Sequence, residues 1–336
     1  MKEALFYEKT ANKQVQCGLC RFRCIIAEGR RGICNVRENR GGSLYSLVYG
    51  KIIAENIDPV EKKPLFHFLP GSETFSIATA GCNFHCLQCQ NSSISQMSGI
   101  TNIPGLFRSP AEIVQRAVIQ NCSSISYTYT EPTIFYEYAL ETAQLGKEAG
   151  LKNVFVTNGY ICKEPLLRIA PFLDGANIDL KGFDHKKYPA IFGGKLAGVL
   201  DSIIEYKRLG IWLELTTLVI PGVNDSDEEL AAIAAFIHDN LGTDTPWHLS
   251  RFYPTYKMTD RPATPVATVM RALEIGRRAG LHHVYAGNIP GDKDENTLCQ
   301  SCQRVLIERS GFSVTADRLE DGHCPGCGAA VAGVWG

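Results

Sequence analysis

The stretch FSIATAGCNFHCLQCQN, residues 75–91, indicates the kind of fold this chain has. Its first five residues, 75–79, are apolar or small and predict a β-strand that leads to a turn at Gly81. The loop after that turn spaces its cysteines as Cys82-x3-Cys86-x2-Cys89 and contains no fourth cysteine. Structural thiolate sites have four ligands arranged as a tetrahedron. A strand followed by three thiolates within one loop therefore indicates a metal centre with one position open.

Three thiolates can hold three irons of a [4Fe–4S] cluster and leave the fourth iron without a protein ligand. An iron of that kind can chelate a substrate, which a purely structural site has no need to do. Two alternatives are a zinc site completed by His85 and a redox-sensing loop. The zinc site is strained, since His85 lies between two of the cysteines in the sequence. The cluster is the preferred interpretation.

Strand and helix patterns alternate along the chain after this loop. Capping sequences at 109–112 and 226–229 mark two helix starts, and a third helix is expected over 133–149. Further strands are expected at 124–129, 152–156, 176–180, 211–220, 247–252 and 282–286. Strands that alternate with helices form right-handed βαβ units in a parallel sheet. The sequence therefore predicts an α/β fold, a full or partial (β/α) barrel, over residues 73–290.

The composition is that of an ordinary globular chain. It has 336 residues, 45% hydrophobic and 21% charged, with 34 Lys plus Arg against 35 Asp plus Glu. This length allows one large domain with small satellites, and a net charge of −1 provides no basic field for nucleic acid or acidic membranes. The longest apolar run, 231–237, is too short to cross a bilayer, and the first residues lack a signal-peptide pattern. We expect a cytoplasmic protein with no membrane partner.

Four further cysteines form a cluster near the N-terminus: Cys17, Cys20, Cys24 and Cys34. In a reducing compartment clustered cysteines favour metal binding over disulfides. Four thiolates fit either zinc or an auxiliary iron–sulfur cluster, and the sequence leaves both open. The arginines between them are expected to offset thiolate charge rather than to bind nucleic acid. We assign this cluster to a cysteine-rich module over 1–50, which a segment over 51–72 connects to the barrel.

The last cluster pairs Cys299-x2-Cys302 with Cys324-x2-Cys327. Two such pairs have the spacing of a zinc ribbon, in which two knuckles close a tetrahedral site. Zinc is the expected metal, with an auxiliary iron–sulfur cluster as the alternative. The flanking charges are not net basic, so structural support or partner docking is expected rather than nucleic-acid binding. This zinc-ribbon-like module is predicted over 291–336.

The cysteine loop after the first barrel strand resembles the radical S-adenosylmethionine (SAM) superfamily. Residues 81–91 and the Asp179-Leu180-Lys181 sequence are especially similar to the branch that contains the pyruvate formate-lyase activating enzyme and other glycyl-radical-enzyme activases. The whole chain resembles the radical SAM family of the AmmeMemoRadiSam system. That resemblance includes the outer cysteines and the segments 62–65, 127–133 and 247–254.

The resemblance implies an oxidoreductase-type enzyme that cleaves SAM reductively at a [4Fe–4S] cluster. Methionine and a 5′-deoxyadenosyl radical would result, and the radical would remove a hydrogen atom from the substrate. An electron donor such as flavodoxin or ferredoxin is then expected. Because the cofactors carry the difficult chemistry, the protein would bind and orient them.

The expected SAM-binding residues lie at the ends of predicted strands. Lys181 can neutralise the methionine carboxylate, and Asp179 or Glu131 can hold the ammonium group. The ribose hydroxyls are assigned to two polar residues after the third strand, and SAM or substrate to one histidine: Thr157, Asn158 and His248. Arg251 is expected at the rim, since it does not share a strand face with His248.

The sequence departs from the activase pattern in two places. Activases commonly have two glycines before the Glu-Pro pair, where this chain has Tyr129 and Thr130. They also often have an aspartate where this chain has Val156. We expect a protein or peptide substrate from the activase resemblance, with a small molecule as the alternative. A non-catalytic zinc-binding scaffold protein is the rival from another functional class.

Overall fold

The computed structural model describes residues 1–289 and 294–336. The boundary expected between residues 290 and 291 lies outside the described residues. Within the described part of the chain, the helices fall short of the length and apolarity that a membrane crossing requires.

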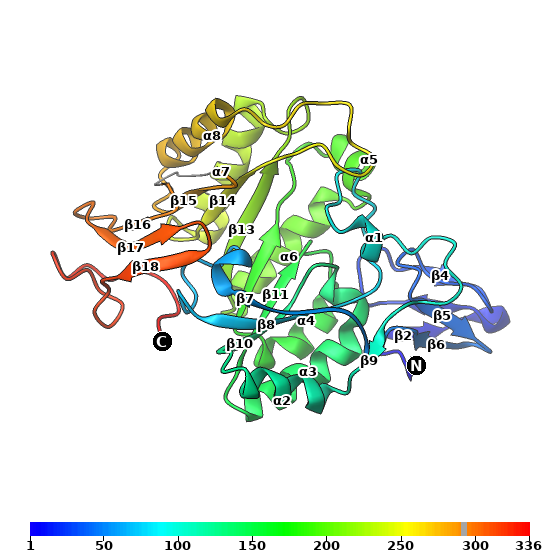
Figure 1. Ribbon diagram of the computed structural model, residues 1–336. Coiled ribbons are helices and arrows are strands. Elements are labelled where there is room, and N and C mark those ends of the chain that lie inside the picture. The colour runs from blue at the N-terminus through cyan, green and yellow to red at the C-terminus, as the bar shows by residue number, and fades with distance from the viewer. Residues whose placement is uncertain (290–293) are drawn as a thin grey trace.

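A nine-stranded sheet forms the centre of the molecule (Figure 1). Seven of its strands are parallel and follow one another in chain order: β8 (Glu73–Thr79), β10 (Ser124–Tyr127), β11 (Lys152–Thr157), β12 (Gly175–Asp179), β13 (Trp212–Val219), β14 (Trp247–Arg251) and β15 (Val284–Gly287). These strands confirm the parallel α/β sheet expected from the sequence, with ends that differ by one or two residues.

The sheet order is open rather than closed. Beyond β8 it continues with two antiparallel strands, β7 (Lys51–Pro59) and the short edge strand β9 (Leu106–Phe107). The opposite edge is β15, and the described strands show no pairing between β15 and β9. The segment over 51–72, expected as a connection, therefore contributes β7 to the central sheet.

The α-helices connect the parallel strands, and short 3-10 turns lie elsewhere in the chain as well. The helices are α1 (Ser92–Ser95), α2 (Pro110–Ile119), α3 (Tyr136–Glu148), α4 (Lys163–Ile169), α5 (Lys187–Phe192), α6 (Leu196–Arg208), α7 (Asp227–Leu241) and α8 (Val266–Arg278), with short 3-10 turns η1 (Ala11–Lys13), η2 (Val60–Lys62), η3 (Pro132–Phe135) and η4 (Ala170–Phe172). Ser109 and Glu112 form the expected capping box of α2, and Ser226 caps α7. Because each connection moves one strand along in the same direction, right-handed crossovers place their helices on the same face of the sheet.

Two small β modules flank the sheet, at the right and the left of Figure 1. The N-terminal module has two three-stranded sheets, β1 (Lys2–Glu3), β6 (Ser43–Ser46), β5 (Arg37–Arg40) and β2 (Tyr7–Lys9), β3 (Val15–Cys17), β4 (Ile25–Ile26). The C-terminal module has β16 (Thr297–Leu298), β17 (Val305–Ser310) and β18 (Ser313–Asp317).

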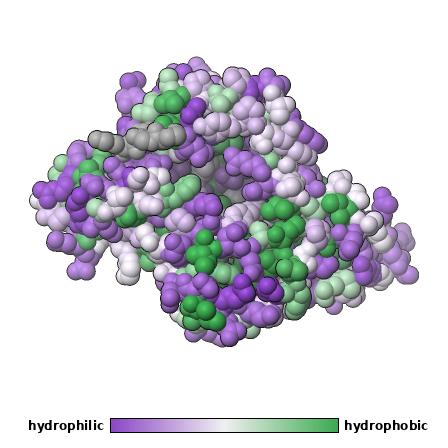
Figure 2. Space-filling model, in the orientation of Figure 1, coloured by the Kyte–Doolittle hydropathy of each residue, from purple (hydrophilic) through white to green (hydrophobic). Residues whose placement is uncertain are grey.

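The two modules differ in how they join the core. Buried residues of the N-terminal module, such as Val15 and Val36, belong to the same hydrophobic cluster as the sheet residues. The C-terminal module has a small cluster of its own around Leu306 and Ile307. On the face shown in Figure 2, hydrophobic residues gather near β9, where Phe107 is exposed.

Candidate functional site

A cavity of about 1200 Å³ lies at the carboxyl ends of the parallel strands. In parallel α/β sheets this edge is where ligands bind. Nine residues singled out from the sequence line this one cavity: Cys82, Cys86, Cys89, Glu131, Thr157, Asn158, Asp179, Lys181 and His248. The structure therefore brings together residues that are up to 166 positions apart in the chain.

The sulfur atoms of the three loop cysteines do not all lie within 4.8 Å of one another. A tetrahedral zinc with Zn–S bonds of about 2.3 Å needs sulfurs about 3.8 Å apart. Among the described residues, the C-terminal cysteines alone form a group of three or more potential ligands whose atoms all lie within 4.8 Å of one another. His85, the proposed fourth zinc ligand, is exposed and its Nδ1 lies 2.8 Å from Gln96 Oε1. The loop thus does not fit a mononuclear zinc site.

A [4Fe–4S] cluster does not need sulfurs that close together, since each thiolate then binds a different iron. Burial raises the pKa of the Cys82 thiol well above its usual value and that of Cys86 to about 12. Thiolates that are buried in this way need a bound cation to stabilise them. The loop is held by its neighbours: Phe84 N donates to Cys82 Sγ at 3.3 Å, and Cys89 Sγ lies 3.2 Å from Ser95 Oγ.

Asp179 and Lys181 form an ion pair at the end of β12, with Lys181 Nζ 2.8 Å from Asp179 Oδ2. Burial alone would lower the pKa of Lys181, but the nearby Asp179 and Cys86 raise it. The side chain of Lys181 is 17% exposed and that of Asp179 is 35% exposed. A positive and a negative group therefore stand side by side on the cavity wall, next to the cysteine loop.

Glu131, in contrast to Asp179, is held by hydrogen bonds from neighbouring N–H and O–H groups. Its carboxylate accepts hydrogen bonds from Thr133 N at 3.0 Å, Thr133 Oγ1 at 2.6 Å, Thr157 Oγ1 at 2.7 Å and Asn158 N at 2.8 Å. A carboxylate has about four acceptor sites. Burial raises the pKa of Glu131 even though these hydrogen bonds oppose the shift. Glu131 is thus satisfied within the protein and ties the ends of β10 and β11 together.

Thr157 and Asn158 line the cavity, and both also have structural roles. Thr157 Oγ1 donates to Glu131, while Asn158 Nδ2 donates to Asn83 Oδ1 at 2.8 Å. Asn158 therefore links the end of β11 to the cysteine loop. Val156, which replaces the aspartate common in activases, also lines the cavity.

His248 belongs to a buried polar group that the sequence did not reveal. Its Nε2 lies 2.6 Å from Glu214 Oε2, and its ring packs against Phe66 and Tyr285. Glu214 also accepts from the backbone N–H groups of Phe66 and His67 and from Trp212 Nε1. These contacts fix the histidine ring at the cavity wall. Arg251, expected at the rim, donates to a backbone carbonyl at Thr264 and is not among the cavity-lining residues.

Tyr129 explains one departure from the activase pattern. Its φ of 61° lies in the left-handed region, where glycine is comfortable and a tyrosine is strained. Its hydroxyl donates to Asp58, and its ring lies 4.6 Å from Lys63 Nζ. The backbone shape that a glycine would favour is therefore kept, and a tyrosine side chain is added to the cavity wall.

Asp58 and Lys63 form a buried ion pair beside Tyr129. Asp58 accepts from Lys63 Nζ at 2.6 Å and from Lys62 Nζ at 2.7 Å. Burial alone would raise the pKa of Asp58, but these hydrogen bonds and that of Tyr129 hold it well below its usual range. Burial lowers the pKa of Lys63 to about 8. The sequence signal was the Lys-Lys-Pro segment, whose partner in β7 could not be identified from spacing.

The C-terminal module covers one side of the cavity. The turn between β17 and β18, including Gly311 and Phe312, lines it. Arg309 anchors this turn: its Nη2 donates to Phe66 O at 2.6 Å, and its Nε lies 3.6 Å from Glu61 Oε1. Sequence reasoning did not assign the module to the cavity, because nothing local connects residues 309 and 66.

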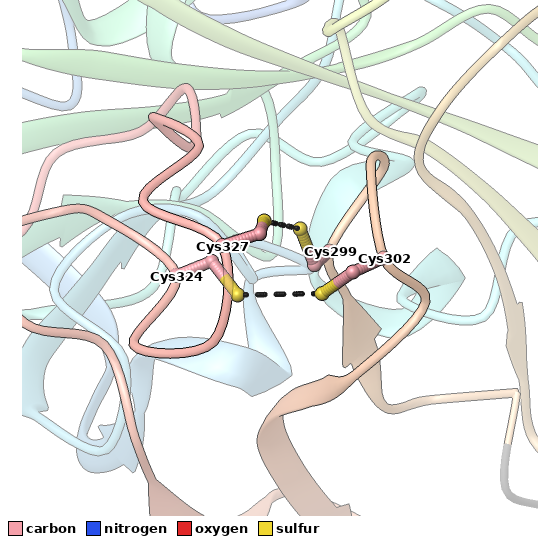
Figure 3. A group of neighbouring side chains, drawn as sticks. All are labelled: Cys299, Cys302, Cys324 and Cys327. Carbon is pink, nitrogen blue, oxygen red and sulfur yellow. Dashed lines mark hydrogen bonds between the residues drawn. The ribbon is translucent and has the colours of Figure 1, made fainter.

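The four C-terminal cysteines come together, as expected for a metal site. Cys299 Sγ lies 3.6 Å from Cys327 Sγ, and Cys302 Sγ lies 3.6 Å from Cys324 Sγ (Figure 3). These separations are close to the 3.8 Å or so of a tetrahedral zinc thiolate site. The group can therefore hold a single metal ion.

The chain matches the radical SAM superfamily model over residues 76–234. An uncharacterized protein of Methanocaldococcus jannaschii is 46% identical over 333 residues, which span 98% of this chain and 99% of that protein. Residues 76–234 therefore form a radical SAM domain.

More distant relatives agree with this assignment. The 4-hydroxyphenylacetate decarboxylase activating enzyme of Clostridium scatologenes is 27% identical over 119 residues, covering 34% of this chain and 38% of that enzyme. Among solved structures, a radical SAM methyltransferase from Sphaerobacter thermophilus is similar with a TM-score of 0.50 at 18% identity, covering 66% of this chain and 68% of that one. The structural likeness concerns the fold alone.

Proposed function

We propose that this protein cleaves SAM reductively at a [4Fe–4S] cluster held by Cys82, Cys86 and Cys89. The observation that carries the proposal is that these thiols share one cavity with the ion pair of Asp179 and Lys181. When bound, the cluster supplies one electron to the sulfonium of SAM, which yields methionine and a 5′-deoxyadenosyl radical. The protein's part is to bind SAM, orient it and keep competing molecules out.

The charges of the cavity match the methionine end of SAM. Lys181 is placed to pair with its carboxylate and Asp179 with its ammonium group. Of the two carboxylates expected for the ammonium, we favour Asp179, because Glu131 already accepts four hydrogen bonds. Thr157 and Asn158 remain our proposal for the ribose, and His248 for SAM or the substrate.

The test is the formation of 5′-deoxyadenosine under reducing, anaerobic conditions. Cys86→Ala should abolish it while the chain stays folded, because an iron then loses its thiolate. Cys122→Ala is the matched control, since Cys122 is buried, belongs to none of the three cysteine clusters and does not line the cavity. Unchanged SAM cleavage in Cys86→Ala would refute the proposal. Zinc at every site without iron would support the scaffold alternative.

For the substrate we propose a protein or peptide, as the similarity to activating enzymes suggests. A cavity of about 1200 Å³ exceeds the range of roughly 300–1,000 Å³ typical of small-ligand pockets, so SAM leaves room for a second molecule. A flavodoxin or ferredoxin would supply the electron. The AmmeMemoRadiSam branch is our proposal for the place of this chain within the superfamily.

One observation favours a small-molecule substrate instead. The C-terminal turn at Gly311 and Phe312 forms part of the cavity wall, as a cover over a small ligand would. Incubation with SAM, a reductant and separate protein and metabolite fractions of a cell extract distinguishes the two. Deoxyadenosine released above background by the metabolite fraction alone would reject the protein substrate.

For the C-terminal cysteines we propose zinc in a structural role. Support comes from the two sulfur–sulfur separations of 3.6 Å and from a closed set of four thiolates, which leaves no position for a substrate.

A further inference from the structure

The four N-terminal cysteines surround a small cavity of their own. Cys17, Cys20, Cys24 and Cys34 all line it. The remaining wall is mainly apolar and includes Leu19, Phe22 and Ile26. Four thiols that line one cavity with a mainly apolar wall form a built site rather than a chance cluster.

The spacing of these sulfurs distinguishes them from the C-terminal group. Among the residues that the structure describes, the N-terminal cysteines do not supply three ligand atoms that all lie within 4.8 Å of one another, whereas the C-terminal four do. One zinc ion requires close sulfurs, since all of them bind the same atom. A [4Fe–4S] cluster has its thiolates at four corners and so requires wider spacing. The N-terminal site therefore fits the cluster better than zinc.

Arg37 points to an anionic occupant of this cavity. Its side chain lines the cavity and is 2% exposed. The Nη2 group donates to Glu137 and to Leu5 O, but Nε and Nη1 have no partner. A buried donor without a partner costs about 1–3 kcal/mol, and more when it is charged. The sulfurs of a cluster with four thiolates, which carries net negative charge, would accept these hydrogen bonds.

Asn83 supplies a second donor of the same kind. It is fully buried, lines the N-terminal cavity and follows Cys82 directly in the chain. Its Oδ1 accepts from Asn158, whereas its Nδ2 has no partner. One asparagine thus lies between the N-terminal cavity and the cysteine loop of the SAM site.

The backbone around Gly81 shows how closely the two sites approach. A Cβ at Gly81 would lie 2.6 Å from Val36 Cγ1 and 3.2 Å from the carbonyl oxygen of Cys34. The N-terminal cysteine segment is therefore packed directly against the start of the SAM-site loop.

From these contacts we propose that Cys17, Cys20, Cys24 and Cys34 bind a second [4Fe–4S] cluster that passes single electrons to the SAM site. The electron step rests on the proposed function above, whereas the cluster itself does not. One electron enters from a protein donor of the flavodoxin or ferredoxin class and reduces the N-terminal cluster. The cluster returns to its oxidised state when that electron passes to the cluster of the SAM site.

Metal analysis of a variant that lacks the SAM-site thiols tests the cluster. The full chain carrying Cys82→Ala, Cys86→Ala and Cys89→Ala, reconstituted anaerobically, should hold about four irons and four sulfides. Absence of iron together with a second equivalent of zinc would overturn the proposal. If this variant does not fold, Cys34→Ser in the otherwise unchanged chain should lower the iron from about eight to about four, and unchanged iron would overturn it.

A second measurement tests the electron path. With reduced flavodoxin as donor, Cys34→Ser should slow SAM cleavage at least tenfold, while dithionite, which is small enough to reach the SAM site itself, should restore most of the rate. Equal rates for Cys34→Ser and the wild type with flavodoxin, or equal losses with both reductants, would overturn the electron path. A failure of the proposed function looks different, since the wild type would then hold iron at the N-terminal site and cleave no SAM with either reductant.

Discussion

Replacing Lys181 by alanine tests how the cavity recognises SAM. The ammonium of Lys181 lies 2.8 Å from Asp179 Oδ2, and its side chain is 17% exposed. In the proposed complex this ammonium pairs with the carboxylate of SAM. A hydrogen bond to a charged group contributes about 1.5–3 kcal/mol. Since about 1.4 kcal/mol is a factor of ten in affinity, Lys181→Ala should weaken SAM binding about ten- to a hundredfold. The raised pKa of Lys181 keeps it charged, so we expect this loss to be the same from pH 6 to 9.

Anaerobic titration calorimetry of the reconstituted protein measures this effect. Asp179→Asn should weaken SAM by a similar factor, because it removes the partner of the ammonium group. Lys186→Ala is the matched control, since Lys186 is exposed and does not line the cavity. Wild-type affinity in both Lys181→Ala and Asp179→Asn, or an equal loss in Lys186→Ala, would refute the reasoning.

Three further predictions concern other parts of the molecule. Cys302→Ser should remove one equivalent of zinc, measured by mass spectrometry, and leave the cluster absorbance unchanged; loss of iron instead would contradict a zinc site. Glu214→Leu leaves four donors without an acceptor and should lower the free energy of unfolding by about 3 kcal/mol or more, measured in urea. Because burial lowers the pKa of Lys63 to about 8, the unfolded chain binds more protons above that pH, and stability should rise between pH 8 and 10.5 by roughly 3 kcal/mol relative to Lys63→Met. A constant difference between those two proteins would contradict it.

The sequence predicted the parallel sheet because the strand segments are apolar and are separated by helices with recognisable capping residues. The predicted strand ends lie within one or two residues of the observed ends. The sequence also predicted nine site residues that lie at one edge of the sheet, since the carboxyl ends of parallel strands meet there. Contacts between residues far apart in the chain could not be predicted from the sequence. The pairing of His248 with Glu214 joins two strands whose register appears only in the folded sheet, and the anchoring of Arg309 at Phe66 joins positions 243 residues apart. The spacing of cysteines likewise predicted ligands without predicting how far apart their sulfurs lie.

The different ways in which the two modules join the core have a consequence for unfolding. Val15 and Val36 share one hydrophobic cluster with the central sheet, so the N-terminal module and the sheet should melt as a single cooperative unit. The C-terminal module has its own small cluster around Leu306, and a metal held by its four thiolates would stabilise it. Calorimetry should then resolve two transitions, and a chelator should shift only the one that belongs to the C-terminal module. Removal of that metal would then loosen the side of the cavity formed by Phe312 while the central sheet stays folded.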